Sequence, residues 1–161
     1  MRISARGFTL IELLIVIAII GILTAIAIPS FSSFNTNQRL SQAAKQVKND
    51  LRSAQNRAIN SVEGNAWGIN IAPDATYYTM FKCPTTATYT LTNCSSVAQK
   101  NLSSGFTIRN PGFSDLVFDV VSGNVYVGGS LQTSGNFTFE VGSTTTQRTI
   151  TVSAGGKIEE E

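Results

Sequence analysis

The sequence predicts an α+β protein in which one long N-terminal helix packs on an antiparallel β-sheet head. Three observations lead to this prediction. An apolar run covers residues 13–28, a helical pattern of apolar residues covers residues 38–62, and beyond Gly64 apolar residues recur at every second position. One helix followed by a series of strands is typical of a helix packed on one face of a sheet. The 161 residues leave room for one modest domain after the N-terminal helix.

A single carboxylate, Glu12, lies at the head of the apolar run, behind a basic leader of residues 1–7. Insertion scales put a charged side chain at the bilayer centre at a cost of roughly 2.5–3.5 kcal/mol, so Glu12 needs a partner. Cleavage between Gly7 and Phe8 would create an α-amino cation four residues before Glu12, close to one helical turn. The ammonium and the carboxylate could then neutralise each other, within one chain or between neighbouring copies.

Residues 6–12 read Arg-Gly-Phe-Thr-Leu-Ile-Glu. Together with the apolar run they resemble the N-terminus of type IV pilins and of the pseudopilins of type II secretion. The resemblance implies that a prepilin peptidase cleaves after Gly7, that the new N-terminal Phe8 is N-methylated, and that Glu12 guides subunit registry in the filament. The implied partners are that peptidase, other pilin or pseudopilin subunits, the inner-membrane assembly platform and membrane lipid.

Residues 8–29 are expected to form the transmembrane half of the helix. A helix over 21 of these residues rises about 31 Å, enough to cross a hydrocarbon core. Arg2 and Arg6 precede it, and the positive-inside tendency keeps that end in the cytoplasm. We therefore expect a single-pass inner-membrane protein whose head, residues 30–161, lies in the periplasm. By the resemblance, assembly moves the subunit into an extracellular pilus or a periplasmic pseudopilus.

Two other interpretations of the N-terminus remain open. Residues 8–29 could be a plain single-span anchor, with Glu12 near the cytoplasmic interface. Alternatively, Ala-Ile-Ala at residues 25–27 fits the cleavage site of a secretory signal peptide, which would make the chain a secreted soluble β-domain. The apolar run is somewhat long for the core of a signal peptide, and that interpretation leaves Glu12 unexplained.

The composition favours an extracellular β-rich domain over a cytosolic enzyme. Charged residues make up only 14% of the chain, and Ser, Thr, Asn and Gly are abundant. Removing residues 1–7 takes Arg2 and Arg6 from the twelve basic side chains, so that ten remain beside ten acidic ones. The mature form is therefore near neutral, and no overall field draws it to nucleic acid.

Residues 30–37 are mostly small and polar and predict a break or kink, after which residues 38–62 form an amphipathic helix. Seven apolar residues fall within an arc of about 100° and are expected to pack on the sheet. They are Leu40, Ala43, Ala44, Val47, Leu51, Ala54 and Ala58. Lys45, Lys48 and Arg52 lie on a neighbouring arc of about 60°. This basic strip is either a solvated face whose stems cover the edge of the core, or a contact for other subunits or an anionic partner.

Six to eight strands are expected after the helix. The clearest signals are the alternation of Trp67, Ile69 and Ile71, the return segment 77–81, and the alternation of Phe137, Phe139 and Val141. Turn residues stand at 72–75 and 110–112. Shorter strands are expected around Phe106 and Ile108, at 116–121, at 125–127, and at Ile150 and Val152, with a hairpin turn at Ser122-Gly123-Asn124.

Cys83 and Cys94 enclose a short Thr-rich loop. Placement of the head outside the cytoplasm favours a disulfide between them, because disulfides persist in oxidising compartments. Closing a loop of this size stabilises the fold by roughly 3 kcal/mol. Two free thiols are the alternative.

The sequence predicts no enzyme, no cofactor and no metal site. Histidine is absent, so Ser-His-Asp or Cys-His catalysis has no base, and there is no CxxC motif. Asp115 and Asp119 could be imagined as a carboxylate pair, but two such residues near a strand are expected at solvent-facing or turn positions. No Gly-rich loop connects a strand to a helix, so nucleotide binding is not expected.

A second resemblance covers about three-quarters of the chain. The order Phe118, Gly123, Phe137-Thr-Phe, Arg148-Thr-Ile-Thr-Val and Gly156-Lys157-Ile158 is similar to the GspH/FimT group of minor pilins and pseudopilins. The long major pilins usually carry their disulfide near the C-terminus, whereas Cys83 and Cys94 lie in mid-domain. The resemblance therefore implies a minor subunit that primes or caps a type IV pilus or a type II secretion pseudopilus.

A DNA-binding minor pilin for natural transformation is the alternative function. By the resemblance, that activity uses a basic, arginine-bearing C-terminal tail, but residues 155–161 read Gly-Gly-Lys-Ile-Glu-Glu-Glu and would repel phosphate. Phosphate contacts need clustered Lys or Arg. Only the basic strip and the isolated Arg109 and Arg148 remain, so DNA is not expected as a partner.

Overall fold

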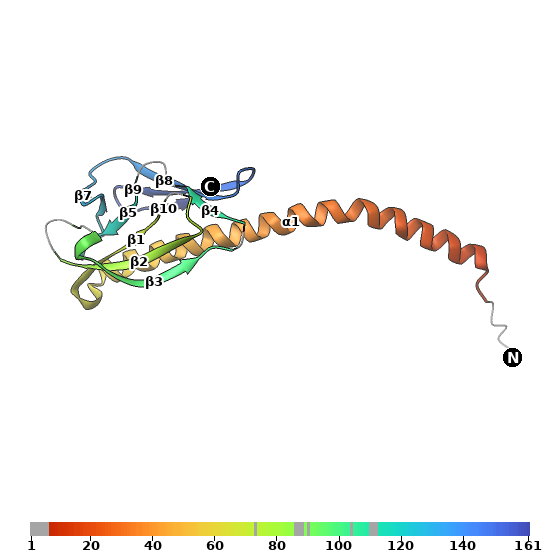
Figure 1. The fold of residues 1–161 in the computed structure, drawn as a ribbon, viewed down its shortest axis with the longest axis horizontal. Helices are drawn as coiled ribbons and strands as arrows, with labels where there is room; N and C mark the ends of the chain where they lie inside the picture. Colours follow the sequence, from red (N-terminus) through yellow and green to blue (C-terminus); the bar gives the residue numbers. More distant parts are fainter. Residues whose placement is uncertain (1–6, 73, 86–88, 90, 104, 110–112) are drawn as a thin grey trace. The chain divides into compact units, whose positions relative to one another are not determined.

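A computed structural model describes residues 7–72, 74–85, 89, 91–103, 105–109 and 113–161, and for residues 26–32 it describes the backbone alone. The leader up to residue 6, Pro73, residues 86–88 and 90 of the loop after Cys83, Ser104 and the turn at 110–112 lie outside the described residues. Two compact units are present, Met1–Gln38 and Arg39–Glu161. Helix α1, Leu10–Ile59, contributes to both of them (Figure 1).

Of the break or kink expected at residues 30–37, the break is wrong, because α1 continues through this segment. Ser, Thr and Asn lower helix propensity by only a few tenths of a kcal/mol each, so a short polar segment does not end a 50-residue helix. The helix ends at Ile59, three residues before the end predicted from the apolar pattern. Ser61 and Glu63 adopt left-handed φ angles of 51° and 58°, which a continuing α-helix cannot contain. A 3₁₀ turn, η1 (Val62–Gly64), follows.

The first unit, which we call the stem, exposes all of the apolar side chains that the structure describes in it. From Leu10 to Leu23 the large apolar residues are between 50% and 77% exposed. Among the residues with described side chains, no helix offers an apolar stretch of the length that a membrane span requires. The side chains of residues 26–29, which belong to the expected span, lie outside the described ones.

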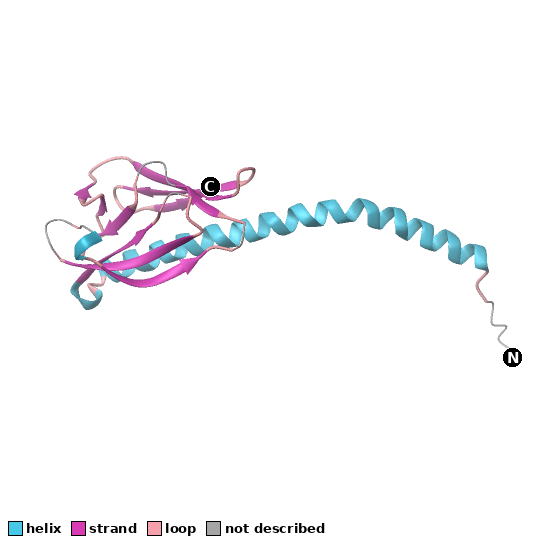
Figure 2. Cartoon of the chain, in the orientation of Figure 1, coloured by secondary structure: helices cyan, strands magenta, loops and turns pink. Residues whose placement is uncertain are grey.

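We call the second unit, Arg39–Glu161, the head. In the head, the predicted apolar stripe of the helix is confirmed. All seven of its residues are at most 3% exposed and belong to the main core. That core also contains residues from both sheets, including Trp67, Tyr78 and Phe118 from one and Phe139 and Ile150 from the other. The head is therefore the helix-on-antiparallel-sheet arrangement that the sequence predicts (Figure 2).

Two antiparallel sheets form the rest of the head, and within the described residues they comprise ten strands. The six-stranded sheet has the order β3-β2-β1-β5-β6-β7. Its strands are β1 (Asn65–Asn70), β2 (Tyr77–Pro84), β3 (Ser95–Asn101), β5 (Asp115–Phe118), β6 (Val125–Val127) and β7 (Ser130–Leu131). The four-stranded sheet has the order β10-β9-β8-β4. Its strands are β4 (Thr107–Arg109), β8 (Asn136–Gly142), β9 (Gln147–Ser153) and β10 (Ile158–Glu160).

The predicted hairpin at Ser122-Gly123-Asn124 pairs the expected strands but has a longer connection. Phe118 lies opposite Val125, so six residues join β5 to β6. Asp119 accepts hydrogen bonds from the backbone nitrogen of Val120 and from Ser122 Oγ, both at 2.9 Å, and so closes the loop locally. Strand β5 is therefore shorter than the expected 116–121.

A second, smaller core lies on the other face of the six-stranded sheet. It contains Ala66, Phe81, Cys83, Tyr89 and Val117. Phe81 lies directly opposite Gly68 on the neighbouring strand, and a Cβ at Gly68 would lie 2.3 Å from the Leu116 carbonyl oxygen and 2.9 Å from the Phe81 ring. The absence of a side chain at Gly68 thus lets the aromatic ring lie on the strand.

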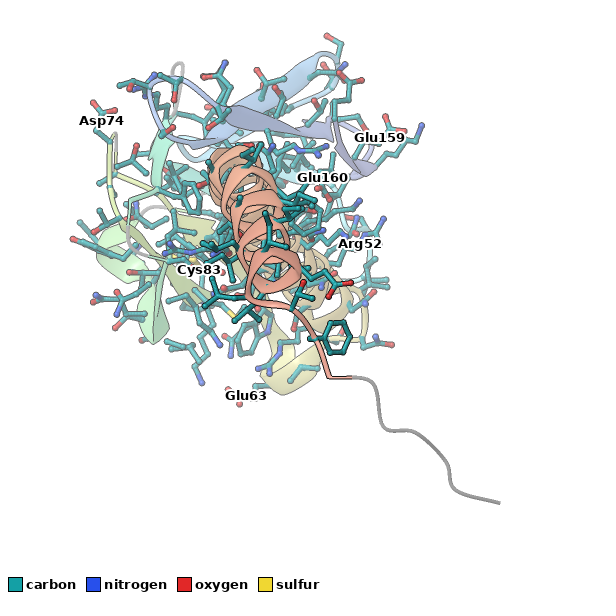
Figure 3. All side chains as sticks on the ribbon, turned by 90° about the vertical axis from the view of Figure 1, so that its right-hand side faces the viewer. Arg52, Glu63, Asp74, Cys83, Glu159 and Glu160 are labelled. Carbon is teal, nitrogen blue, oxygen red and sulfur yellow. A yellow bond between two sulfur atoms is a disulfide. The ribbon has the colours of Figure 1, made fainter. Side chains whose placement is uncertain are left out.

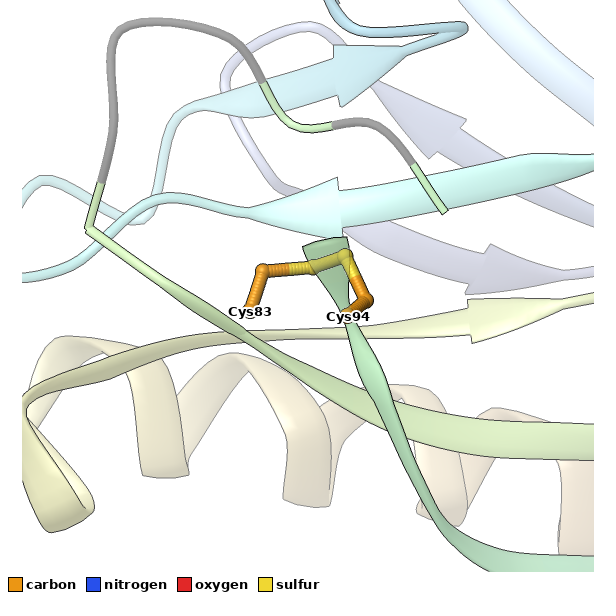
Figure 4. Close-up of a disulfide and its surroundings, with 2 residues drawn as sticks. All are labelled: Cys83 and Cys94. Carbon is orange, nitrogen blue, oxygen red and sulfur yellow. A yellow bond between two sulfur atoms is a disulfide. The ribbon is translucent and has the colours of Figure 1, made fainter. Parts of the chain in front are cut away.

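The disulfide expected between Cys83 and Cys94 is present and joins the end of β2 to the start of β3 (Figure 4). Tyr89, inside the closed loop, donates a hydrogen bond to Asp119 and contacts the Tyr126 ring edge-to-face at 4.8 Å. Burial, with the neighbouring Asp119 carboxylate, raises the pKa of Tyr89. The loop is therefore anchored both to its own hairpin and to the β5–β6 connection.

Candidate functional site

The N-terminal site is built around the first turn of α1, and Thr9 is the residue that caps this helix. The backbone nitrogen and the hydroxyl of Thr9 both donate to Glu12 Oε2, each at 2.8 Å. In return, the Glu12 backbone nitrogen donates to Thr9 Oγ1 at 3.3 Å. This reciprocal pattern is a capping box, which satisfies helix donors that otherwise lack a partner.

Sequence reasoning singled out Glu12 but missed Thr9. The signal was present, because Thr-Leu-Ile-Glu is the Ser/Thr-x-x-Glu spacing of a capping box. The capping box does not exclude a later pairing of Glu12 with an amine, since the carboxylate can accept further hydrogen bonds.

The predicted cleavage site precedes the capping box. Gly7 and Phe8 lie outside the helix, and the Phe8 side chain is 91% exposed. The peptide bond between them is therefore outside regular structure and open to an enzyme, and cleavage there would leave a free amine four residues before Glu12.

The basic strip is divided in the structure. Lys48 forms an ion pair with Glu160 of β10 at 3.4 Å, and Glu160 is almost buried. The Arg52 guanidinium donates to the Ile158 carbonyl oxygen at 3.4 Å, whereas Lys45 is exposed and forms no ion pair within the described part of the chain. Figure 3 shows Arg52 and Glu160 on the same side of the head.

The C-terminal strand is thus bound to the helix at several points. Besides the contacts of Lys48 and Arg52, Gln55 Nε2 donates to the Gly156 carbonyl oxygen at 2.7 Å. Lys157 pairs with Glu159 at 2.6 Å, and elsewhere in the head Arg109 pairs with Asp74 at 3.7 Å. Lys48, Lys157 and Arg109 thus each have a carboxylate beside them, and cations paired in this way do not favour phosphate binding.

Asp115 corrects a prediction, because it is only 7% exposed rather than solvent-facing. It lies on β5 and accepts a hydrogen bond from Ser114 Oγ at 3.0 Å, while Asp119 belongs to the following turn. Each carboxylate therefore has its own local partners. Among the described residues, no group of three His, Cys, Asp or Glu side chains could hold a metal ion.

A polar contact ties α1 to the six-stranded sheet inside the head. The Tyr78 hydroxyl, on β2, donates to Asp50 Oδ2 at 2.5 Å, and the Tyr78 ring is fully buried. Burial of the phenol, together with its bond to the Asp50 carboxylate, raises the pKa of Tyr78 far above its usual value.

Known proteins resemble this chain most clearly at its N-terminus. Residues 2–28 match the profile of the prokaryotic N-terminal methylation motif. The chain is 60% identical over 43 residues to the type IV major pilin protein PilA of Myxococcus xanthus, which covers 27% of this chain and 20% of PilA. It is 42% identical over 75 residues to a fimbrial protein of Pseudomonas aeruginosa, which covers 47% of each. The chain thus spans less than half the length of these relatives.

The fold, in turn, is similar to that of a solved pseudopilin. The minor pseudopilin EpsH from the type 2 secretion system of Vibrio cholerae aligns with a TM-score of 0.54 and 16% identity, covering 76% of this chain and 94% of that chain. The N-terminal part of the chain is thus similar to type IV pilins, and its fold is similar to that of a pseudopilin.

Proposed function

We propose that this chain is a minor subunit that primes or caps a type IV pilus or a type II secretion pseudopilus. The observation that carries the proposal is the N-terminal arrangement: an exposed Gly7–Phe8 junction, followed by a capped helix whose apolar stem holds Glu12 in its first turn. The minor role is supported by the fold, which is similar to that of EpsH, a minor pseudopilin. The matches to PilA and to the fimbrial protein, by contrast, cover less than half of the chain.

Each N-terminal residue has a role in this proposal. A prepilin peptidase cleaves after Gly7, and Phe8 becomes the N-methylated first residue. Residues 8–29 then hold the subunit in the inner membrane, with the head in the periplasm, until it enters the filament. An unpaired carboxylate is costly in lipid, so Glu12 favours the place where a Phe8 amine, its own or a neighbour's, neutralises it.

Replacing Glu12 by Ala tests this role. We expect Glu12→Ala to leave cleavage and membrane insertion intact and to abolish crosslinking to other filament subunits, because the charge that pairs with the Phe8 amine is gone. Glu140→Ala, on strand β8 of the head, is the matched control. Normal incorporation of the Glu12→Ala variant into filaments would contradict the role assigned to Glu12.

Intact mass tests the processing step. Cleavage after Gly7 leaves Phe8 as the first residue of the mature protein, whereas a signal peptidase acting after Ala27 leaves Ile28.

A deletion strain distinguishes a subunit of the type IV pilus from a subunit of the type II secretion pseudopilus. Lost surface pili with normal secretion identify a pilus subunit, and normal pili with a depleted set of secreted proteins identify a secretion pseudopilin.

A further inference from the structure

Six exposed polar residues form a line along the head portion of α1, and the last of them is the residue that directly follows the helix. We call this line the amide stripe. Its members are Gln42, Lys45, Asn49, Arg52, Asn56 and Asn60. Successive members are three or four residues apart, so they share one face of the helix. At 1.5 Å per residue the stripe is about 27 Å long.

The amide stripe contains two cations and no carboxylate. Asp50 is the only acidic residue between Arg39 and Ile59, and it lies off the stripe, where it accepts the Tyr78 hydrogen bond. Lys48 lies beside the stripe and is paired with Glu160. Within the described residues neither Lys45 nor Arg52 has a carboxylate partner.

The stripe is also hollowed toward the end of the helix. An open depression of about 360 Å³ is lined there by four stripe residues, Asn49, Arg52, Asn56 and Asn60, together with Ser53, Arg57 and Val62. The Arg57 guanidinium stacks over the Trp67 ring, 4.7 Å from the ring centroid, so that this cation is held in place. The depression thus offers amide donors and acceptors beside fixed positive charge.

We propose that the amide stripe binds a carboxylate-bearing helix of a different filament subunit. A straight stripe of residues at three- and four-residue spacing matches the ridges of a second helix laid along it. The stripe supplies cations that lack acidic partners, so charge complementarity requires carboxylates on the facing helix. The amides can donate to or accept from the polar residues between those carboxylates.

The same charges argue against two other occupants. A second copy of this chain laid stripe to stripe would bring Lys and Arg against Lys and Arg, with no carboxylate between them. A length of duplex DNA equal to the stripe carries roughly sixteen phosphates, one per about 1.7 Å, against the two cations of the stripe and the neighbouring Arg57. The stripe therefore indicates a heterologous protein neighbour, as a minor subunit would have.

This inference rests on the proposed function, and site-specific photocrosslinking in the full-length chain, expressed in its own bacterium, tests both. A benzoylphenylalanine replaces Asn56 in the stripe or, separately, Ile15 in the stem. We expect the Asn56 crosslink to map, by mass spectrometry, to a helix of another pilin-like subunit with Asp or Glu within one turn. The Ile15 crosslink reports filament incorporation independently of the stripe.

Charge reversal then tests complementarity. Lys45→Glu with Arg52→Glu should lower the Asn56 crosslink by about ten-fold or more, because like charges then oppose each other. Lys100→Glu with Arg148→Glu, the same charge change on β3 and β9, should leave it unchanged. Reversing the mapped carboxylate to Lys should restore the crosslink to the double variant.

The outcomes separate the two proposals. An Ile15 crosslink without one from Asn56, an Asn56 crosslink to a second copy or to DNA, or one that charge reversal does not weaken would overturn the stripe's role alone. Absence of both crosslinks would overturn the proposed function and the inference with it.

Discussion

The stem and the head use the same helix in opposite ways. In the stem, Leu14 is 53% exposed although it lies in a continuous apolar run, whereas in the head Leu51 is completely buried. The head segment is less apolar overall, with charged and amide residues on its outer face, yet it is the segment that carries its own core. Burial therefore depends on whether the chain itself supplies a partner surface.

Because of this difference, the apolar residues of the head and of the stem contribute free energy to different processes. Head residues lose contact with water when the single chain folds, so their contribution appears in its unfolding free energy. Stem residues remain exposed in the isolated chain, and large exposed apolar surfaces indicate a protein or membrane interaction site. The stem's contribution is thus expected in membrane insertion and assembly rather than in the stability of the head.

Two leucine substitutions give the largest expected contrast. Leu51→Ala should lower the unfolding free energy of the head by about 3 kcal/mol, because it leaves a cavity beside both sheets. Leu14→Ala, the same change in the stem, should alter it by less than about 0.5 kcal/mol. Trp67 is the only tryptophan and is buried in the head, so its fluorescence during thermal unfolding of the detergent-solubilised chain reports the head alone. Equal shifts of the unfolding temperature in the two variants would contradict the division of roles between stem and head.

A smaller effect is expected from the tie between α1 and β2. Tyr78→Phe removes the hydrogen bond to Asp50 and should cost about 1–2 kcal/mol, since bonds to charged groups are stronger than neutral ones. The pKa of Tyr78 is raised by folding, so its contribution to stability is complete below the unfolded value of about 10 and declines as the pH rises above it.

The measurement is the Trp67 unfolding midpoint between about pH 8 and pH 11, on either side of the unfolded tyrosine pKa, compared with Tyr77→Phe as control. Tyr77 is the neighbouring residue on β2 and is 42% exposed. Part of the alkaline loss should disappear in Tyr78→Phe, and Tyr89, whose pKa is also raised, accounts for a further part. An alkaline profile identical in Tyr78→Phe and the unchanged protein would contradict the role of this phenol.

How much of the fold could be predicted depended on whether an element buries one face. The helix stripe and the strands around Trp67 and Phe139 alternate clearly, because one side chain in each period enters the core. Strand β3, with the polar sequence Ser-Ser-Val-Ala-Gln-Lys-Asn, is an edge strand that is almost wholly exposed, so it carries no alternation. Strand β7 has only two residues, and Ile158 is the only apolar residue of the three in β10, so neither strand carries a periodic signal.

The candidate site shows a similar limit. Glu12 and the Gly7–Phe8 junction are local in sequence, and the Thr9 cap was readable there too. The partner of Lys48 was not readable, because Glu160 lies 112 residues further along the chain and reaches the helix through the pairing of β10 with β9. The three cations of the basic strip look equivalent on a helical projection. In the fold, however, only Lys48 is paired with a carboxylate, whereas Arg52 donates to a backbone carbonyl oxygen and Lys45 forms no ion pair in the described part of the chain.

The smallest predicted effect tests this division among the cations. Lys48→Met retains the aliphatic part of the side chain but removes the charge beside Glu160. It should lower the unfolding free energy of the head by about 1 kcal/mol, because that carboxylate is almost buried. Lys45→Met should leave the unfolding midpoint unchanged, since Lys45 has no ion pair in the described head. In crosslinking from Asn56 the order should reverse, with Lys45→Met weakening the crosslink and Lys48→Met preserving it. Equal effects of the two variants in both measurements would contradict this division. They would mean that Lys48 contributes to the same binding surface as Lys45 despite its ion pair with Glu160.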